Sequence, residues 1–420
     1  MLEKISNNRV FIGNHSLSWE RLISYALDQK KDFAEIRTPL AFIIDSSHQA
    51  INVLAQILVN KSDAILIGRD RVSQPVQDLL LNSGFSIVDE QNPILEPTNN
   101  TNVELGRISL LTSGTTGSPK LVHHSWKSIN TYSNTGRIST NNWVLPYQIG
   151  TYAWFQLVSL SLFVEGQNLI ISDEDDMHDN FKIAKKWGAS AISATPTFWR
   201  VAAMQVSRED LSSIDFKQIT LGGEIVDQSI IDLLSSLYPD CKITHIYASS
   251  EAGASIIVSD GEAGFPEDLL YKQSNSPIKL RINDGRLFVK STFSAKNSRN
   301  DDEWVDTGDR VEKKGDRIYF KGRVESSMIN VGGNKAFPVD IEEAILLHPE
   351  IEWCRVRPVK APLLGFLPEV DVYTSSGTDE VNLEKMMIDF LDDKIPEYAV
   401  PRIWNFLDEI PISANLKSEL

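Results

Sequence analysis

Apolar positions along the chain alternate between short continuous runs and longer mixed stretches. The runs at 39–44 and 64–68 are almost wholly apolar, as in strands covered on both faces, and the stretch 48–59 between them has the length of a helix. The same alternation continues, with strands expected at 168–171, 189–193 and 242–247 and helices expected at 180–187 and 228–237. Strands that alternate with helices predict a layered α/β domain.

The pattern changes after about residue 271. Short runs at 278–282, 286–290 and 317–320 predict a small β subdomain. The last part of the chain is of α+β type, with helices expected at 338–349 and 382–392 and strands expected at 353–359 and 368–374. The segment 91–102 is rich in Asn, Pro and Thr, and it is expected to be a loop.

One segment carries unusual chemistry. Thr112 to Lys120 reads TSGTTGSPK and follows the apolar run 108–111. Its glycines allow backbone N–H groups to surround an anion, its hydroxyls donate further hydrogen bonds, and the lysine adds a positive charge. These features predict a phosphate loop, although Pro119 and Leu121 break the common nucleotide-loop pattern. The alternative is a solvated turn between two strands.

TSGTTGSPK resembles the signature loop of the adenylate-forming superfamily, which includes acyl-CoA synthetases, nonribosomal adenylation domains and firefly luciferase. Four more segments resemble motifs of that family in the same order: YASSEAG at 247–253, WVDTGD at 304–309, GRVESSMINVGGNKAFPVDIE at 322–342 and PISANLKSEL at 411–420. Ala248 and Ser250 replace a glycine and a threonine of the family pattern, and Leu416 stands where many relatives have glycine.

The resemblance implies a division into two domains. A large AMP-binding domain is expected over 1–324, with a truncated N-terminal part, and a small C-terminal lid over 325–420, with the hinge at Glu325. The expected fold class is therefore α/β. A large layered α/β domain carries a small β subdomain, and a small mobile α+β domain follows.

The resemblance also implies roles for individual residues in binding ATP and Mg²⁺. Glu251 would bind Mg²⁺, Ser250 would contact the α-phosphate, and Lys417 would reach between the carboxylate and the α-phosphate. The other expected nucleotide ligands are Thr112, Ser113, Gly114, Thr115, Thr116, Gly117 and Lys120 at the phosphates, Asp309 with Arg323 at the ribose, Gly222, Gly223 and Tyr247 at the adenine, and Glu224, Ala248 and Ser249 beside them.

Simpler interpretations exist for three of these residues. Asp309 suits a β-turn acid, Glu251 suits an exposed helix-capping carboxylate, and Lys417 lies three residues from the chain end, where side chains are usually solvated.

Members of the superfamily carry out a second step, in which the lid rotates and a thiol attacks the acyl-adenylate. The turn Gly332–Gly333 would then face the large domain and leave room for the pantetheine arm of CoA or of a carrier protein. The alternative is an ordinary tight turn between a strand and a helix.

The acid substrate is less well defined by the sequence. The stretch 145–157 contains no acidic residue to hold an α-ammonium group, so an amino acid substrate is not favoured. Tyr147, Tyr152, Trp154 and Phe198 suit a pocket for an aryl or acyl chain, with Phe155 and Trp199 beside them. The alternative for these aromatic residues is the hydrophobic core.

Composition sets limits on location and partners. A net charge of −16 argues against nucleic-acid binding and against an anionic membrane surface. No apolar stretch has transmembrane length and the N-terminus does not resemble a signal peptide, so a cytoplasmic protein with two reduced cysteines is expected.

The thiol acceptor stays open. From 324 to 420, Asp and Glu outnumber Lys and Arg by 18 to 8, which is unfavourable for docking an acidic carrier protein. Arg355, Arg357 and Lys360 offer a basic strand that would suit a phosphate group of the acceptor, or they are solvated strand residues.

Three functions therefore compete. An ATP-dependent acid-thiol ligase is the main expectation. The alternatives are an adenylating enzyme that passes the acyl group to an amine, and a catalytically silent nucleotide-binding protein.

Overall fold

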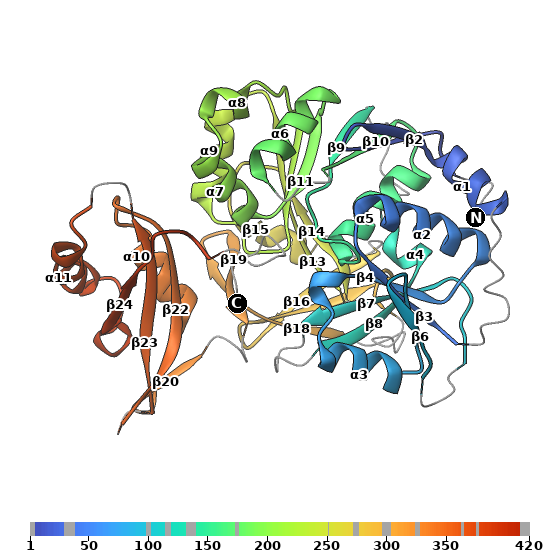
Figure 1. The fold of residues 1–420 in the computed structure, drawn as a ribbon. Coiled ribbons are helices and arrows are strands. Elements are labelled where there is room, and N and C mark those ends of the chain that lie inside the picture. The colour runs from blue at the N-terminus through green and yellow to red at the C-terminus, as the bar shows by residue number, and fades with distance from the viewer. Residues whose placement is uncertain are drawn as a thin grey trace.

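The computed structural model describes residues 5–28, 38–97, 102–113, 119–131, 140–172, 176–250, 252–271, 277–295, 304–323, 328–362, 365–374 and 378–411. These residues form four β-sheets and the helices that cover them. In Figure 1 the C-terminal elements, in orange and red, lie at one end of the molecule, and the blue N-terminal helices lie at the other. Within the described part of the chain, no helix is long and apolar enough to cross a membrane.

The first sheet has six strands in the order β6-β5-β3-β4-β7-β8. The inner strands pair in parallel, and the edge strands β6 and β8 pair antiparallel. The expected strands and helix near its start are confirmed. The expected loop at 91–102 is partly wrong, because β6 pairs with β5 in a hairpin there. β6 is an exposed edge strand, so its sequence lacks an apolar pattern. The elements are β3 (Leu40–Ile44), α2 (Ser47–Asn60), β4 (Ala64–Gly68), η3 (Arg69–Arg71), α3 (Gln74–Asn82), β5 (Ser86–Asp89), β6 (Asn92–Leu95), β7 (Arg107–Ser113) and β8 (Pro119–Ser125).

The second sheet has eight strands in the order β14-β13-β12-β11-β9-β10-β1-β2. Only its two outermost pairs, β1 with β2 and β13 with β14, are antiparallel. Its strands are β1 (Arg9–Ile12), β2 (His15–Ser18), β9 (Asn141–Val144), β10 (Gln167–Ile171), β11 (Ala191–Ala194), β12 (Gln218–Gly222), β13 (Lys242–Ser249) and β14 (Gly253–Val258).

Helices cover both faces of this eight-stranded sheet and divide the apolar interior into two main clusters. One cluster lies around α2 and α5, and the other lies around α6, α7 and α9. The helices are α1 (Trp19–Asp28), α4 (Trp126–Ile129), α5 (Tyr152–Phe163), α6 (Met177–Lys186), α7 (Pro196–Gln205), α8 (Arg208–Ser212) and α9 (Gln228–Leu237).

The predicted β subdomain is a five-stranded antiparallel sheet in the order β15-β19-β18-β17-β16. Its elements are β15 (Phe265–Pro266), η4 (Glu267–Leu270), β16 (Ile278–Asn283), β17 (Arg286–Ser291), β18 (Val305–Lys314) and β19 (Arg317–Arg323).

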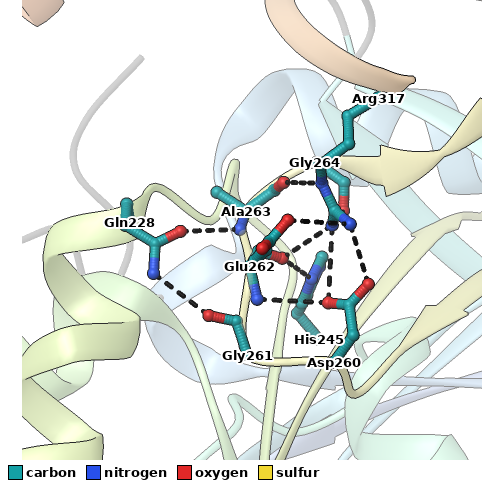
Figure 2. Close-up of polar contacts among 8 residues, drawn as sticks. All are labelled: Gln228, His245, Asp260, Gly261, Glu262, Ala263, Gly264 and Arg317. Atoms are coloured by element: carbon teal, nitrogen blue, oxygen red, sulfur yellow. Dashed lines mark hydrogen bonds and ion pairs between the residues drawn. The ribbon is translucent and has the colours of Figure 1, made fainter. Parts of the chain in front are cut away.

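A buried arginine joins this subdomain to the eight-stranded sheet (Figure 2). Arg317 of β19 is 8% exposed, its Nη1 lies 2.8 Å from Asp260 Oδ2, and it donates to the backbone carbonyls of 262–264 at 3.0–3.3 Å. Gln228 of α9 and His245 of β13 hold the same loop through its backbone. The loop 260–264 is therefore fixed from three elements at once.

The C-terminal unit has a second small sheet, in which β23 pairs with β20, β22 and β24. Its elements are β20 (Ile329–Val331), β21 (Asn334–Ala336), α10 (Pro338–Ile345), β22 (Ile351–Ala361), β23 (Gly365–Thr374), α11 (Glu380–Leu391), η6 (Glu397–Ala399) and β24 (Ile403–Phe406). The predicted fold class is confirmed. The boundary between 324 and 325 stays a prediction, because 324–327 lie outside the described residues.

Helix α10 covers the outer edge of β22. The Val356 amide donates to Glu342 Oε1 at 2.7 Å, and the Cys354 thiol points at the Glu342 carbonyl. Burial raises the pKa of Glu342 to about 7, although the bond from Val356 opposes this shift. Both cysteines of the chain, Cys241 and Cys354, are free, as expected.

Replacing Arg317 with Met should lower the free energy of unfolding by about 2–4 kcal/mol, because it leaves several buried carbonyls and Asp260 without their donor. Chemical denaturation measures this loss. The matched control is Lys313→Met on the neighbouring strand, where an exposed ion pair with Glu267 is removed and little change is expected. Equal losses in both variants would contradict the structural role of Arg317.

Glu342→Gln should stabilise the protein at high pH. The folded state raises the pKa of this acid, so the folded state is penalised as pH rises from the ordinary value of 4.5 through about 7. The variant should gain about 2 kcal/mol at pH 8 and little at pH 4, since the Gln carbonyl still accepts from Val356. Unfolding measured across this pH range tests it, with exposed Glu352→Gln as the control. A gain that does not depend on pH would contradict the prediction.

Candidate active site

Residues singled out from the sequence gather where parallel strands of the eight-stranded sheet end. β11, β12 and β13 are neighbours, so their carboxyl ends meet at one edge. Gly222 ends β12, and a Cβ added to it would lie 3.9 Å from the hydroxyl of Tyr147. That hydroxyl is 3.1 Å from Ser193 Oγ at the end of β11. Ligands of open α/β sheets bind at such an edge, and the Gly222–Gly223 turn and Tyr147 lie there together.

The structure brings three predicted nucleotide ligands from three strands into one cluster. The Tyr247 hydroxyl of β13 donates to Asp309 Oδ2 of β18, and Arg323 Nε of β19 lies 3.1 Å from Asp309 Oδ1. Asp309 and Arg323 are direct partners across the β18–β19 ladder. The sequence analysis gave no role to Phe320, which stacks on Tyr247 at 4.5 Å between ring centroids. Nor did it give one to Thr307, whose hydroxyl accepts from the Asp309 amide.

Burial and the neighbouring carboxylate keep the Tyr247 hydroxyl protonated. Burial raises the pKa of Tyr247, and the charge of Asp309 and its hydrogen bond raise that pKa further. Tyr247 therefore stays a donor at neutral pH. Asp309 is 9% exposed, and a carboxylate accepts several hydrogen bonds at once. The carboxylate is thus able to accept hydrogen bonds from a diol such as a ribose.

The predicted phosphate loop is the turn of the β7–β8 hairpin. Thr112 faces Lys120 across that hairpin, and Ser113 faces Pro119. Thr112 Oγ1 is buried and has no hydrogen-bond partner among the described residues. A buried hydroxyl without a partner is rare in native proteins, and it fits a site that an anion fills. Lys120 is exposed.

The turn that follows β13 is held by a residue that the sequence analysis missed. His124 of β8 is fully buried, and its Nε2 donates to the Ser250 carbonyl at 2.7 Å. The Tyr152 ring lies 5.5 Å from the His124 ring, and a Cβ added to Gly253 would lie 3.3 Å from the Tyr152 hydroxyl. The only signal in the sequence was the pair His123–His124 shortly after the phosphate loop. His124 therefore links the strand that leaves the loop to the turn at Ser249 and Ser250, just past Ala248.

Glu224 has a structural task. Its two carboxylate oxygens accept from the Thr197 amide at 2.9 Å and from the Thr197 hydroxyl at 3.0 Å. This places its charge at the N-terminus of α7, where a negative charge is favourable. The side chain thereby holds the turn after Gly223 against α7, and its expected place beside the nucleotide stays a prediction.

Two of the four aromatic residues expected in a substrate pocket are buried in the hydrophobic core. Trp154 is 2% exposed and packs edge-on against Phe155 at 4.9 Å, within the cluster around α2 and α5. Phe198 is 1% exposed and stacks on Phe181 in the other cluster. Both lie where α5 and the start of α7 are buried on nearly every face, and their place in a substrate pocket stays a prediction. Tyr147 and Tyr152 remain candidates.

The turn Gly332–Gly333 differs from the expected strand-to-helix connection. It joins β20 to β21 as a hairpin, with φ of 58° and 93°, values at which an L side chain is strained. No atom lies within 4 Å of a Cβ placed on Gly333, so the turn is open on that side.

Several predicted residues lie outside the described part of the chain, and nothing is concluded about their placement. Within the described residues, no group of three or more His, Cys, Asp or Glu side chains is arranged to hold a metal. The predicted residues outside are Gly114, Thr115, Thr116, Gly117, Glu251, Glu325 and Lys417.

Charged contacts join the C-terminal unit to the β subdomain beside the Asp309 cluster. Arg310 follows Asp309, its Nη2 lies 3.1 Å from Asp340, and its guanidinium stacks over Phe337 at 3.9 Å. Lys321 of β19 is buried and pairs with Glu343 of α10. A cavity of about 440 Å³ lies at this junction, lined by Arg310, Lys335, Phe337 and Tyr398 among others.

Comparison with known proteins gives relatives along most of the chain. A 2-succinylbenzoate–CoA ligase of Bacillus licheniformis is 23% identical over 412 residues, which cover 89% of this chain and 80% of that protein. The fold matches ATP-bound MatB from Rhodopseudomonas palustris with a TM-score of 0.75 at 14% identity, over 98% of this chain and 94% of that one. It also matches an anthranilate CoA ligase in complex with anthranoyl-AMP, with a TM-score of 0.71 at 15% identity, over 99% and 93%.

Two family models match the chain in the expected order. The model described as AMP-binding enzyme matches residues 60–276, which include the phosphate loop, the Gly222–Gly223 turn and Tyr247. The model described as AMP-binding enzyme C-terminal domain matches residues 340–417. The resemblance noted in the sequence is thereby confirmed, and the chain belongs to the AMP-binding enzymes of the adenylate-forming superfamily.

Proposed function

We propose that this chain joins an aryl or acyl carboxylic acid to the AMP part of ATP, releasing pyrophosphate, and then transfers the acyl group to a thiol. The observation that carries the proposal is the convergence of Tyr247, Asp309 and Arg323 from three strands. Family membership and a relative named as a CoA ligase support the same reaction.

The residues present fit a bound ATP. The Thr112 hydroxyl, at the start of the glycine-rich loop, is a buried donor with no partner among the described residues. Asp309 offers lone pairs to ribose hydroxyls, and Arg323 and Tyr247 hold its carboxylate in place. The turn at Gly222 lies beside Tyr147 at the sheet edge, where an adenine would stack.

The reaction brings a carboxylate and a phosphate together, so the site must supply positive charge and pre-aimed donors. Thr112 and Lys120 of the hairpin would hold the outer phosphates, together with the loop between them. Lys417 would approach the carboxylate and the α-phosphate from the C-terminal domain, and Ser250 would contact the α-phosphate. Mg²⁺ held at Glu251 would neutralise the leaving pyrophosphate.

An aromatic acid is favoured over an amino acid. Tyr147 and Tyr152 are the two predicted pocket residues that lie next to motif turns, at Gly222 and Gly253. The segment that contains them has no carboxylate for an α-ammonium group. The relatives reported above include two whose names give an aromatic acid, 2-succinylbenzoate and anthranilate.

CoA is the favoured thiol, and the phosphopantetheine of an acyl carrier protein is the alternative. The open hairpin turn at Gly332–Gly333 would line the path of the pantetheine arm. Arg357, which the sequence offered for a phosphate of the acceptor, is paired with Asp371 at 2.7 Å. That pairing, with the acidity of the C-terminal unit, weakens the case for an acidic carrier. A cytoplasmic location stays a prediction.

Acid-dependent ATP–pyrophosphate exchange tests the proposal directly. We expect exchange with at least one member of a panel of aromatic and aliphatic acids, followed by thioester formation when CoA or a holo carrier protein is added. Lys417→Ala should abolish adenylate formation while leaving ATP binding measurable. Exchange of equal rate in that variant would remove the role given to Lys417.

The other outcomes separate the competing functions. Exchange without a thioester, but with acyl transfer to an added amine, would favour a stand-alone adenylating enzyme. ATP binding with no exchange for any acid would favour a silent nucleotide-binding protein, which the replacements at Ala248, Ser250 and Leu416 keep in consideration.

Changes in the Asp309 cluster should act mainly on nucleotide binding. Asp309→Ala should raise the KM for ATP by about tenfold to a hundredfold, because it removes a charged acceptor and its ion pair with Arg323. Tyr247→Phe keeps the stack on Phe320 and loses one hydrogen bond, so a smaller rise is expected. Steady-state exchange kinetics measures both. A change in kcat alone, with the KM for ATP unaltered, would contradict the assignment.

A further inference from the structure

Arg71 lies at the root of the phosphate loop, although it matches no motif of the sequence. It ends the short η3 turn that follows β4, and its Nη2 donates to the Leu111 carbonyl at 2.8 Å. Leu111 precedes Thr112, so this bond is made to the last stretch of β7 before the loop.

The bond from Arg71 reaches β7 beyond the last residue that pairs with β4. β4 and β7 pair in parallel only at Ala64 with Ile108 and at Ile65 with Ser109. Beyond that point the backbone of β7 no longer has β4 as its ladder partner in the described structure. At Leu111 the described structure pairs β7 with β8, and the Arg71 guanidinium adds a side-chain donor to the Leu111 carbonyl.

Arg71 is also an unusual charge. Its Nη1 is buried without a hydrogen-bond partner, and no carboxylate in the described part of the chain forms an ion pair with it. Burial lowers the pKa of its guanidinium, and the nearby charge of Asp70 opposes that shift. Burying one donor of a charged group without an acceptor costs free energy even on a half-buried side chain, so a structural role alone does not explain why an arginine occupies this position.

The same turn reaches the segment that carries Tyr147 and Tyr152. Gln148 Nε2 donates to Asp70 Oδ2, and Gln148 Oε1 is buried without a partner among the described residues. Gly150 lies so close to β4 that a Cβ would be 2.0 Å from the Leu66 carbonyl, and its φ of 77° suits glycine. The η3 turn therefore touches both the phosphate hairpin and the segment proposed to bind the acid.

We propose that Arg71 is a positioning residue of the phosphate site, which sets the end of β7 and so the position of Thr112 relative to the nucleotide. The inference rests on the proposed function. Through Asp70 and Gln148, the same turn sets the acid-binding segment relative to that loop.

The test compares Arg71→Met with Arg71→Gln. Met fills a similar volume without a donor, and replacing a buried charge with an apolar side chain is often tolerated by the fold. We expect Arg71→Met to raise the KM for ATP by about tenfold to a hundredfold with a smaller change in kcat. Arg71→Gln keeps a donor for the Leu111 carbonyl, so it should recover part of that loss. A Gln variant as impaired as the Met variant would overturn the positioning role.

Arg69 provides a matched control in the same turn. It pairs with Asp45 and Asp89 and makes no hydrogen bond to β7 in the described part of the chain, so Arg69→Met should leave the KM for ATP within about twofold of the wild type. An equal rise in both Met variants would assign the effect to the turn as a whole and would overturn the inference. Gln148→Ala should raise the KM for the acid more than the KM for ATP.

Amide hydrogen exchange gives a readout that does not need activity. Arg71→Met should speed exchange in 109–113 and 119–123, and Arg69→Met should not. If no acid supports pyrophosphate exchange in the wild type, the proposed function fails, and this measurement still tests Arg71. Unchanged protection of the hairpin together with an unchanged KM for ATP would refute the inference.

Discussion

The buried carboxylate of Asp309 is the interaction on which the site depends. A negative charge at this depth is tolerated only when donors surround it, and they come from Tyr247 of the eight-stranded sheet and Arg323 of the β subdomain. The cluster therefore exists only while the two sheets keep their relative position. Arg317 holds that position from the same strands, because it binds the loop that His245 of β13 also holds. The contacts of Arg317 and the cluster of Tyr247, Asp309 and Arg323 both use β13 and β19, and they lie only a few residues apart along these strands.

Strand β18 brings the nucleotide cluster and the C-terminal unit within one residue of each other. Successive side chains of a strand point to opposite faces. Asp309 turns toward Tyr247, and Arg310 turns toward Asp340 and Phe337 of the C-terminal unit. On β19, Lys321 forms a similar ion pair with Glu343 of α10 in the C-terminal unit. Ion pairs that lie next to Asp309 thus join the C-terminal unit to the β subdomain.

Local patterns in the sequence were sufficient for most elements and for the identity of many site residues. Continuous apolar runs predicted β3 and β4, and the helix α9 was placed at its observed bounds. The pattern did not predict β6, because an exposed edge strand needs no apolar side chains. Aromatic residues at 154 and 198 were assigned to a pocket because composition does not distinguish a pocket wall from a core. His124 and Arg71 were missed, since each donates a hydrogen bond to a backbone carbonyl far away in the chain, and such a bond leaves no recognisable pattern in the sequence.

By itself, the sequence determined the family, the order of the elements and the chemical types gathered for ATP: a glycine-rich hydroxyl loop, a carboxylate, a guanidinium and a terminal lysine. These depend on residue identity and short spacing, which a linear chain displays directly. Only the tertiary structure decided that Tyr247, Asp309 and Arg323 meet, that Glu224 caps a helix, and that Arg71 supports the end of β7. These contacts join residues 14 to 62 positions apart, and they arise from the packing of whole sheets, which no local pattern contains.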